Sequence, residues 1–270
     1  MDEREMVTEA DRRAFADDGV VCLRQRFDAT WVERLRRAQD EMLAVHHPQI
    51  LNFTAPGNPG RYAMGLFLWR LHPVFREFVF ESPAAEIAAR VLGSRKINLL
   101  HDKMLIKEPG TTERTFWHQD LFFWPVEGAQ ICSIWLALDR VTQETGGVEF
   151  IAGSNHWPER YRPRVPDGLW HKRNMHLPPC PDFDATHRVL RWDLEPGDCL
   201  VFDSIVMHGS GGNTSSDVRR RAHATHWCGD DVTYVDGDFI LELPVSPGLA
   251  TGDPLDSEVF PVVRREDRSS

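Results

Sequence analysis

Residues 195–210, Glu195-Pro-Gly-Asp-Cys-Leu-Val-Phe-Asp-Ser-Ile-Val-Met-His-Gly-Ser210, predict a turn that leads into an apolar strand with a histidine close to its end. Proline and glycine mark the turn, and the apolar run that follows is typical of a buried strand. Comparable apolar runs occur over residues 97–106, 130–138, 147–151, 198–207 and 220–228. Loops rather than regular helices separate these runs, which disfavours a doubly wound parallel sheet and favours a β-sandwich or jelly-roll core.

The first ninety residues have helical patterns instead. Thr8 and Asp28 are candidate caps of two helices, the second of which extends to about Val45. Two further helices are expected over residues 73–80 and 84–92, and a short strand over residues 20–23. Prolines and glycines predict a long loop over residues 48–64, and six prolines with four histidines predict a long excursion from the sheet over residues 155–190. The expected fold class is therefore mainly β with N-terminal helices.

Composition limits the classes of protein to consider. A net charge of −10 argues against general binding to nucleic acid or to an anionic membrane, either of which needs a basic face. Five scattered cysteines form no Cys-x-x-Cys pair, so neither a disulfide framework nor a structural zinc site is expected. The chain starts without a signal-peptide pattern and has no stretch long enough to cross a membrane, so we expect a cytoplasmic protein.

His118 and Asp120, in Trp117-His-Gln-Asp120, are candidate metal ligands. Side chains two apart on an extended segment point to the same face, so both can approach one ion, and His208 can supply a third ligand from a later strand. Two imidazoles and a carboxylate form the facial ligand set of non-haem iron(II) oxygenases, which leaves one side of the metal open. The same ligand types suit catalytic zinc, so they do not decide the metal.

Three consecutive arginines, residues 219–221, open a strand soon after the distal histidine. A guanidinium group binds a carboxylate through two parallel hydrogen bonds, so one of them is a candidate anchor for a dicarboxylate. Arg220 shares a strand face with Ala222 and Ala224, which leave space for a small molecule, whereas Arg219 falls on a polar face. Strand alternation therefore favours Arg220, and a solvated strand edge is the alternative for all three.

Taken together, these motifs resemble those of the phytanoyl-CoA dioxygenase family of iron(II)- and 2-oxoglutarate-dependent oxygenases. Their order and spacing agree from about residue 8 to residue 262. The matching segments are Trp117-His-Gln-Asp120, Ile134-Trp-Leu-Ala-Leu-Asp139, Gly146-Gly-Val-Glu-Phe-Ile-Ala-Gly-Ser154, Pro196-Gly-Asp198 and His208-Gly-Ser-Gly-Gly-Asn213. The resemblance implies one oxygenase domain over residues 1–270 with a double-stranded β-helix, a cupin-like jelly roll. Its parts are a mainly helical segment (1–95), the β-helix core (96–230) and a C-terminal extension packed on that core (231–270).

The resemblance also implies site residues. The metal ligands are His118, Asp120 and His208. The expected contacts to 2-oxoglutarate are Met104, Gln119, Trp135 and Ser210, and for the first three a purely structural role is the alternative. The family spacing of eleven residues from the distal histidine points to Arg219 as the cosubstrate anchor. One inserted residue near Ser215-Ser216 moves that anchor to Arg220, in agreement with strand alternation.

The implied activity uses Fe(II), 2-oxoglutarate and O2 to hydroxylate a small-molecule metabolite, with release of succinate and CO2. Asp120 favours hydroxylation, because related halogenases replace this carboxylate with a small residue. Alternatives are another 2-oxoglutarate-dependent oxidation (desaturation, epoxidation or ring formation), a non-catalytic cupin-like protein that binds a metal or metabolite, and a zinc hydrolase. The expected partner is a small-molecule substrate, with neither nucleic acid nor membrane, and the oligomeric state is left open.

The substrate pocket has two groups of candidate residues. The aromatic candidates are Phe67, Trp69, Phe122, Phe123, Trp124, Trp157 and Trp170, although core packing is more usual for such residues. The basic candidates for contact with an anionic group are Arg61, Lys103 and Lys107, of which Lys107 is more typical of the solvated end of a strand.

Overall fold

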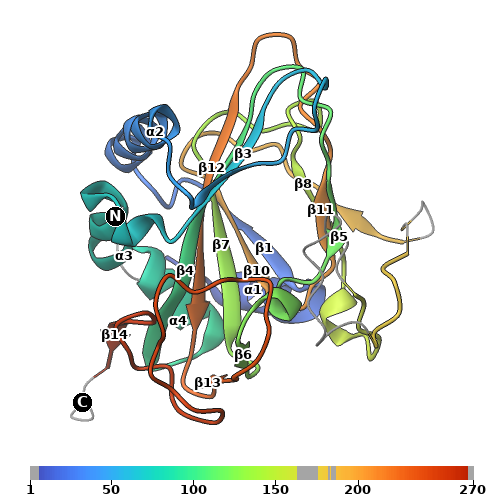
Figure 1. The fold of residues 1–270 in the computed structure, drawn as a ribbon. Coiled ribbons are helices and arrows are strands. Elements are labelled where there is room, and N and C mark those ends of the chain that lie inside the picture. The colour runs from blue at the N-terminus through green and yellow to red at the C-terminus, as the bar shows by residue number, and fades with distance from the viewer. Residues whose placement is uncertain (1–5, 163–175, 182, 184–186, 267–270) are drawn as a thin grey trace.

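The computed structural model describes residues 6–162, 176–181, 183 and 187–266 and has two β-sheets that face each other, with helices on the outer side of the larger one (Figure 1). The larger sheet has the strand order β1-β10-β7-β12-β4-β3-β2, with β14 paired to β4. Its strands are β1 (Val20–Leu23), β10 (Cys199–Asp203), β7 (Ile131–Ala137), β12 (Arg220–Cys228), β4 (Lys96–Lys107), β3 (Tyr62–Leu66), β2 (Ile50–Asn52) and β14 (Val262–Arg265).

The smaller sheet has the order β5-β11-β8-β9 and contains His118 and His208, two of the three candidate metal ligands. Its strands are β5 (Thr115–His118), β11 (His208–Ser210), β8 (Val148–Ile151) and β9 (Val189–Leu190). A third pair joins β6 (Val126–Glu127) to β13 (Thr233–Tyr234), at the lower end of the larger sheet in Figure 1. Short 3-10 turns lie at η2 (Leu68–Arg70), η3 (Asp120–Phe123) and η4 (Ser154–His156).

Four α-helices form from local signals that the sequence contains. They are α1 (Glu9–Asp18), α2 (Ala29–Ala44), α3 (Pro73–Glu81) and α4 (Ala84–Leu92). Thr8 and Asp11 form a reciprocal capping box at α1, and the Asp28 carboxylate accepts from the Trp31 amide at α2. Apolar side chains of the helices, with Phe75 and Phe78 among the largest, pack on the outer face of the larger sheet, where Met104 and Ile106 also lie. Burial of this layer is the main favourable term in holding the helices on the sheet.

The predicted fold class, mainly β with N-terminal helices and a jelly-roll core, is confirmed, and two local predictions are wrong. The expected loop over residues 48–64 contains β2 and most of β3, because the amide of Phe53 bonds the carbonyl of Tyr62 and closes a hairpin. The expected strand over 198–207 ends at Asp203, and a turn then carries the chain to β11 in the other sheet. Much of the excursion predicted over 155–190, including Trp170, lies outside the described residues.

Antiparallel pairing of β3, β4, β12 and β7 aligns the side chains that face the smaller sheet. Successive rows are two residues apart along each strand. Row one contains Tyr62, Lys107 and Arg220; row two Met64, Leu105, Ala222 and Ala137; row three Leu66, Lys103, Ala224 and Trp135; and row four His101, His226 and Ser133.

None of the helices in the described part of the chain has the length and hydrophobicity that a membrane-spanning helix requires.

Candidate active site

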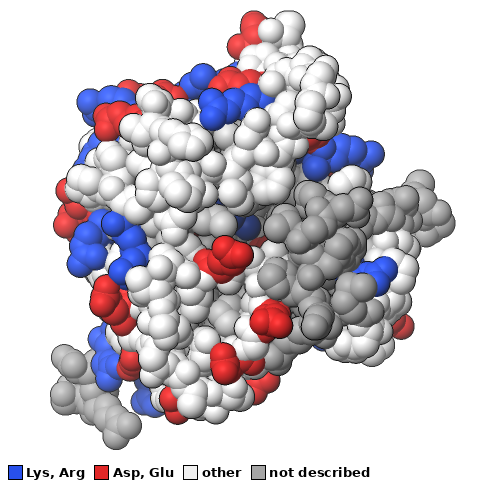
Figure 2. Space-filling view, viewed as in Figure 1, with Lys and Arg blue, Asp and Glu red and all other residues white. Residues whose placement is uncertain are grey.

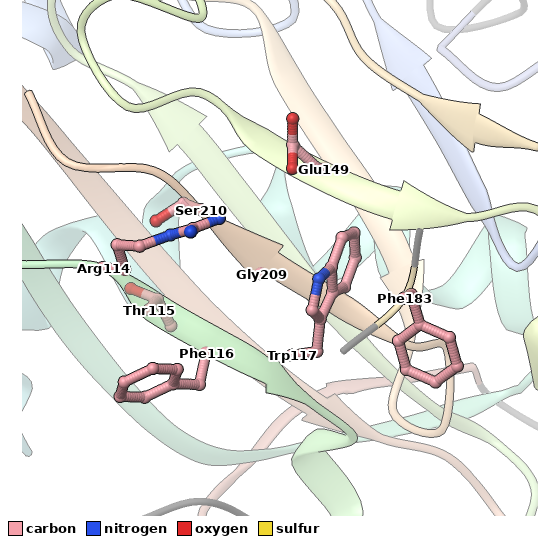
Figure 3. Close-up of a pocket in the computed structure, with 8 residues that line it drawn as sticks. All are labelled: Arg114, Thr115, Phe116, Trp117, Glu149, Phe183, Gly209 and Ser210. Atoms are coloured by element: carbon pink, nitrogen blue, oxygen red, sulfur yellow. The ribbon is translucent and has the colours of Figure 1, made fainter. Parts of the chain in front are cut away.

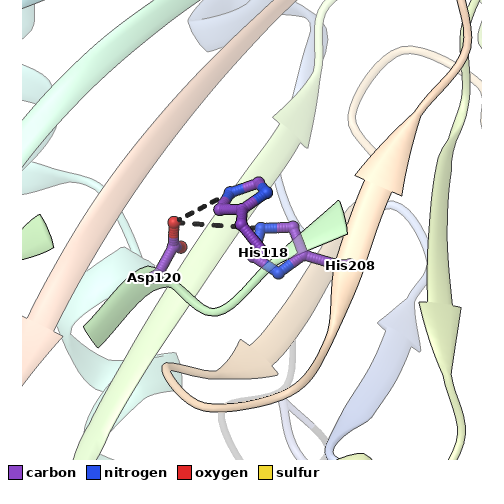
Figure 4. A group of neighbouring side chains, drawn as sticks. All are labelled: His118, Asp120 and His208. Carbon is purple, nitrogen blue, oxygen red and sulfur yellow. Dashed lines mark ion pairs between the residues drawn. The ribbon is translucent and has the colours of Figure 1, made fainter. Parts of the chain in front are cut away.

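Three side chains from neighbouring segments meet between the sheets. His118 ends β5, Asp120 opens η3, and His208 begins β11, directly opposite His118 in the strand register. Asp120 Oδ1 lies 3.4 Å from His118 Nε2 and 3.8 Å from His208 Nε2 (Figure 4). The structure therefore brings together the three residues that the sequence proposes as metal ligands, with one donor atom of each within 4.8 Å of the others.

Backbone hydrogen bonds fix the orientation of both imidazoles. His118 Nδ1 lies 2.8 Å from the carbonyl of Phe116, and His208 Nδ1 lies 3.1 Å from that of Val206. An Nδ1–H that donates to a carbonyl leaves the Nε2 lone pair for a metal. Burial, with the nearby His118, lowers the pKa of His208 to about 3, so this imidazole is neutral at physiological pH.

Asp120 is buried and stays ionised. Burial alone would raise its pKa, but Lys103, His208 and His118 lower it well below its ordinary value. The Ser133 hydroxyl donates to Oδ2 at 3.2 Å, which leaves Oδ1 facing the histidines. Two imidazoles and one ionised carboxylate, without a thiolate, fit the facial ligand set for iron(II), and the donor types also suit zinc.

A second polar group lies at row one of the larger sheet. Arg220 is 2% exposed, and its Nε has no hydrogen-bond partner among the described residues. The guanidinium carbon lies 5.6 Å from the centre of the Trp135 ring. Burial lowers the pKa of Arg220 to about 10, so the side chain remains charged, and no carboxylate of the described residues lies within ion-pair distance of it. A buried, unpaired guanidinium is the feature expected of an anion site.

Lys107 is next to Arg220 in the same row and is fully buried, which corrects its expected place at a solvated strand end. Its amine donates to the Ser210 hydroxyl at 2.9 Å and to the Gly211 carbonyl. Burial, reinforced by Arg220, lowers the pKa of Lys107 to about 6. Two basic side chains and a hydroxyl thus converge on one end of the site. Lys103, Leu105 and Lys107 share one face of the strand, but the sequence of β4 alone does not show that this face is the inner one.

Arg219 lies in a different setting. Its guanidinium pairs at 2.8 Å with Asp40 and at 2.8 Å with Glu108, on the outer side of the sheet. It is therefore already neutralised by two carboxylates, whereas Arg220 has none within ion-pair distance among the described residues.

A family model described as phytanoyl-CoA dioxygenase (PhyH) matches residues 15–222. The chain belongs to the PhyH family. The family predicted from the sequence motifs is thereby confirmed.

Several relatives are similar to this PhyH chain. A probable phytanoyl-CoA dioxygenase of Caenorhabditis elegans is 28% identical over 169 residues, 59% of this chain and 52% of the relative. An ectoine dioxygenase of Sphingopyxis alaskensis is 25% identical and covers 77% of this chain and 72% of the relative. A crystal structure of the non-haem α-ketoglutarate-dependent epimerase SnoN, from nogalamycin biosynthesis, shares the fold with a TM-score of 0.78 at 21% identity, with 100% of each chain covered. The chain spans about half the length of several of its curated relatives.

The other residues that the family resemblance proposed lie in varied positions. Ser210 is beside Lys107, and Trp135 is in row three below Arg220. Gln119 is buried, but its amide donates to the Ile205 carbonyl and accepts from the Tyr161 amide, so both its polar groups are bound to backbone. Met104 packs with the helices on the opposite face of β4, because it alternates with Lys103 and Leu105. The expected contact of Met104 with the cosubstrate does not agree with this packing.

A pocket is formed by residues of β5, β11 and β8 (Figure 3). Its lining residues are Arg114, Thr115, Phe116, Trp117, Glu149, Phe183, Gly209 and Ser210. Of the aromatic side chains proposed for the substrate, Phe67, Trp69 and Trp124 are core residues, whereas Phe123 is partly exposed and lies edge-on to His118 with ring centres 5.6 Å apart.

Proposed function

We propose that this protein is an Fe(II)- and 2-oxoglutarate-dependent dioxygenase that hydroxylates a small-molecule metabolite and releases succinate and CO2. The observation that carries the proposal is the combination of a His-Asp-His cluster with a buried, unpaired cationic end in the same space. A zinc hydrolase would use the same metal ligands but has no need for a dicarboxylate anchor. PhyH membership supports the same choice.

The metal is assigned to His118, Asp120 and His208. When bound, iron and 2-oxoglutarate together supply dioxygen activation coupled to decarboxylation of the cosubstrate. The protein contributes the orientation of the ligands: backbone carbonyls hold both imidazoles with Nε2 free, and Ser133 holds the second oxygen of Asp120. Because Asp120 is a carboxylate, it occupies the position that a halogenase would leave for chloride.

The far carboxylate of 2-oxoglutarate is assigned to Arg220, Lys107 and Ser210. A carboxylate there would pair with the unpartnered guanidinium and share the Lys107 ammonium with the Ser210 hydroxyl. It would also restore the charge of Lys107, whose pKa of about 6 leaves it largely neutral at pH 7 when no anion is bound. Arg219, paired with two acids, is the weaker candidate, and Gln119 supports the turn before His208.

Relatives and fold neighbours differ in the reaction named for them, since they include both an ectoine dioxygenase and an epimerase. Desaturation, epoxidation and ring formation use the same protein groups, so hydroxylation rests on the retained Asp120. A non-catalytic binding protein is the alternative of a different class. We also propose a reducing, cytoplasmic location, supported by Cys22, Cys132, Cys199 and Cys228, which form no disulfide.

Anaerobic protein with Fe(II) and 2-oxoglutarate tests the assignment directly. We expect a visible charge-transfer band that is lost in His118→Ala and Asp120→Ala. Absence of the band in the wild-type protein, or its survival in both variants, would contradict the proposal. A metabolite screen scored by substrate-stimulated succinate release separates an enzyme from a binding protein, and a hydrolytic activity with zinc that ignores 2-oxoglutarate would favour the zinc alternative.

A further inference from the structure

Lys103 is a third cation in the site and serves neither the metal nor the far carboxylate. It lies in row three of the larger sheet, between Leu66 and Ala224, and its side chain is 15% exposed. Its amine lies 3.9 Å from Asp120 Oδ1, the same oxygen that faces both histidines. That oxygen is the donor atom assigned to the metal, so metal binding and the lysine compete for one negative charge.

The charge on Lys103 has a single carboxylate partner in the described part of the chain. Among the described residues, Asp120 is the one carboxylate within ion-pair distance of its amine. Row four next to Lys103 contains two imidazoles beside Ser133. Burial lowers the pKa of His101 to about 3 and that of His226 well below its ordinary value, so both imidazoles are neutral. Neutral imidazoles cannot offset the ammonium once a divalent metal has neutralised Asp120.

The charges of the loaded site do not balance. Lys103, Lys107, Arg220 and a divalent metal carry five positive charges, against one on Asp120 and two on 2-oxoglutarate. The positive charges exceed the negative ones by two, and Lys103, whose carboxylate partner is then shared with the metal, carries part of that excess. A buried charge without a partner is unfavourable, so an ammonium held in the middle of a sheet requires an anion from elsewhere.

The surroundings of Lys103 indicate what kind of molecule brings that anion. Leu66, Leu121 and Phe123 are partly buried apolar residues of one cluster, and Phe123 also borders the metal ligand His118. Figure 2 shows basic atoms at the bottom of a hollow, next to acidic atoms and uncharged surface. Apolar side chains beside a cation fit a ligand with an apolar body that carries an acidic group.

We propose that Lys103 binds a carboxylate of the substrate. The substrate is then a small carboxylic acid with an apolar body, and the carbon that this protein oxidises lies near the acid group. The inference rests on the proposed function, because the need for an anion at Lys103 arises when the metal occupies Asp120. Lys103 is a specificity-determining residue in this assignment, and Asp120 is its partner only until the metal binds.

A pair of probes that differ in charge but hardly in shape tests the assignment. Phenylacetate and phenylacetamide are titrated by calorimetry into anaerobic protein loaded with Fe(II) and 2-oxoglutarate. We expect phenylacetate to bind at least about tenfold more tightly than the amide, as an ion pair in a partly buried site requires. In Lys103→Met the preference should fall to within about twofold, while Lys103→Arg, which keeps the charge, should retain it.

Lys96→Met is the matched control, because Lys96 is on the same strand but pairs with Asp256 at the far end of β4. It should keep the preference for phenylacetate. The charge-transfer band of each protein is recorded first, so that failure of the proposed function, no band in wild type, is distinct from failure of this inference. Three results overturn the inference: no preference in wild type, including no binding of either probe; a preference that survives in Lys103→Met; or a loss of 2-oxoglutarate affinity in Lys103→Met, which would assign the lysine to the cosubstrate.

Discussion

Replacement of Arg220 by methionine tests whether this side chain is needed for binding of the cosubstrate but not for the stability of the fold. Methionine has a similar length and no charge, so the cavity stays filled while the guanidinium is removed. Arg220 makes no hydrogen bond or ion pair to a carboxylate among the described residues, and its Nε is unpartnered. The substitution therefore removes an anchor without breaking an ion pair, although it removes the guanidinium from the face of the Trp135 ring.

The magnitude follows from the burial of the charge. Burial lowers the pKa of Arg220 to about 10, which corresponds to about 3 kcal/mol for keeping the guanidinium charged without a partner. A bound carboxylate offsets that penalty, so Arg220→Met should weaken 2-oxoglutarate binding by about 3 kcal/mol, or roughly 100-fold in Kd. Without 2-oxoglutarate the variant should be at least as stable as wild type, because an uncompensated buried charge is gone.

Titration of anaerobic, Fe(II)-loaded protein with 2-oxoglutarate, followed by the visible charge-transfer band, measures Kd, and thermal unfolding without 2-oxoglutarate measures stability. Arg219→Met is the matched control. It removes the exposed pairs with Asp40 and Glu108, which contribute at most about 1 kcal/mol each to stability, and should leave the Kd unchanged. A Kd of Arg220→Met close to wild type, or a larger loss in Arg219→Met, would refute the reasoning. A lower melting temperature in Arg220→Met would show that the guanidinium has a structural partner.

Three further perturbations test other parts of the site and fold. Lys107 has a pKa of about 6 without an anion, and a dianion binds its protonated form, so 2-oxoglutarate affinity should fall as pH rises from about 6 to 8, by up to about tenfold per pH unit. Lys107→Met should bind more weakly at pH 6 with a flatter profile, and an unchanged slope would exclude the lysine. Ser133→Ala frees Asp120 Oδ2 and should weaken Fe(II) affinity, measured against a chelating dye, by roughly 10- to 100-fold; wild-type affinity would show that the hydroxyl does not position the ligand. Phe75→Ala should lower the free energy of unfolding in urea by about 3–5 kcal/mol, and a loss below about 1 kcal/mol would contradict tight packing of α3 on the sheet.

Local signals account for the parts of the fold that the sequence predicts well. Thr8 and Asp28 cap α1 and α2 through bonds within three residues, and such short-range chemistry is visible in the chain itself. The error over residues 198–207 has a different origin. Val206 and Met207 are as buried as the strand before them, so hydrophobicity is continuous although the chain leaves one sheet for the other after Asp203. An apolar run therefore indicates that its residues are buried, but it does not indicate which sheet they belong to.

Prediction of the site from the sequence is limited in a similar way, because it depends on strand register. Alternation along β12 selects Arg220 from its own neighbours, since Ala222 and Ala224 share its face, and no other strand has to be known. The inward face of β4 cannot be chosen in this way, because it depends on which residue lies opposite Arg220. The pairing of Arg220 with Lys107 makes Lys103 and Leu105 face the metal and turns Met104 toward the helices. A slip of one residue in that pairing would exchange the two faces. The buried cations of β4 are therefore a property of sheet register, and they become predictable only when two strands are read together.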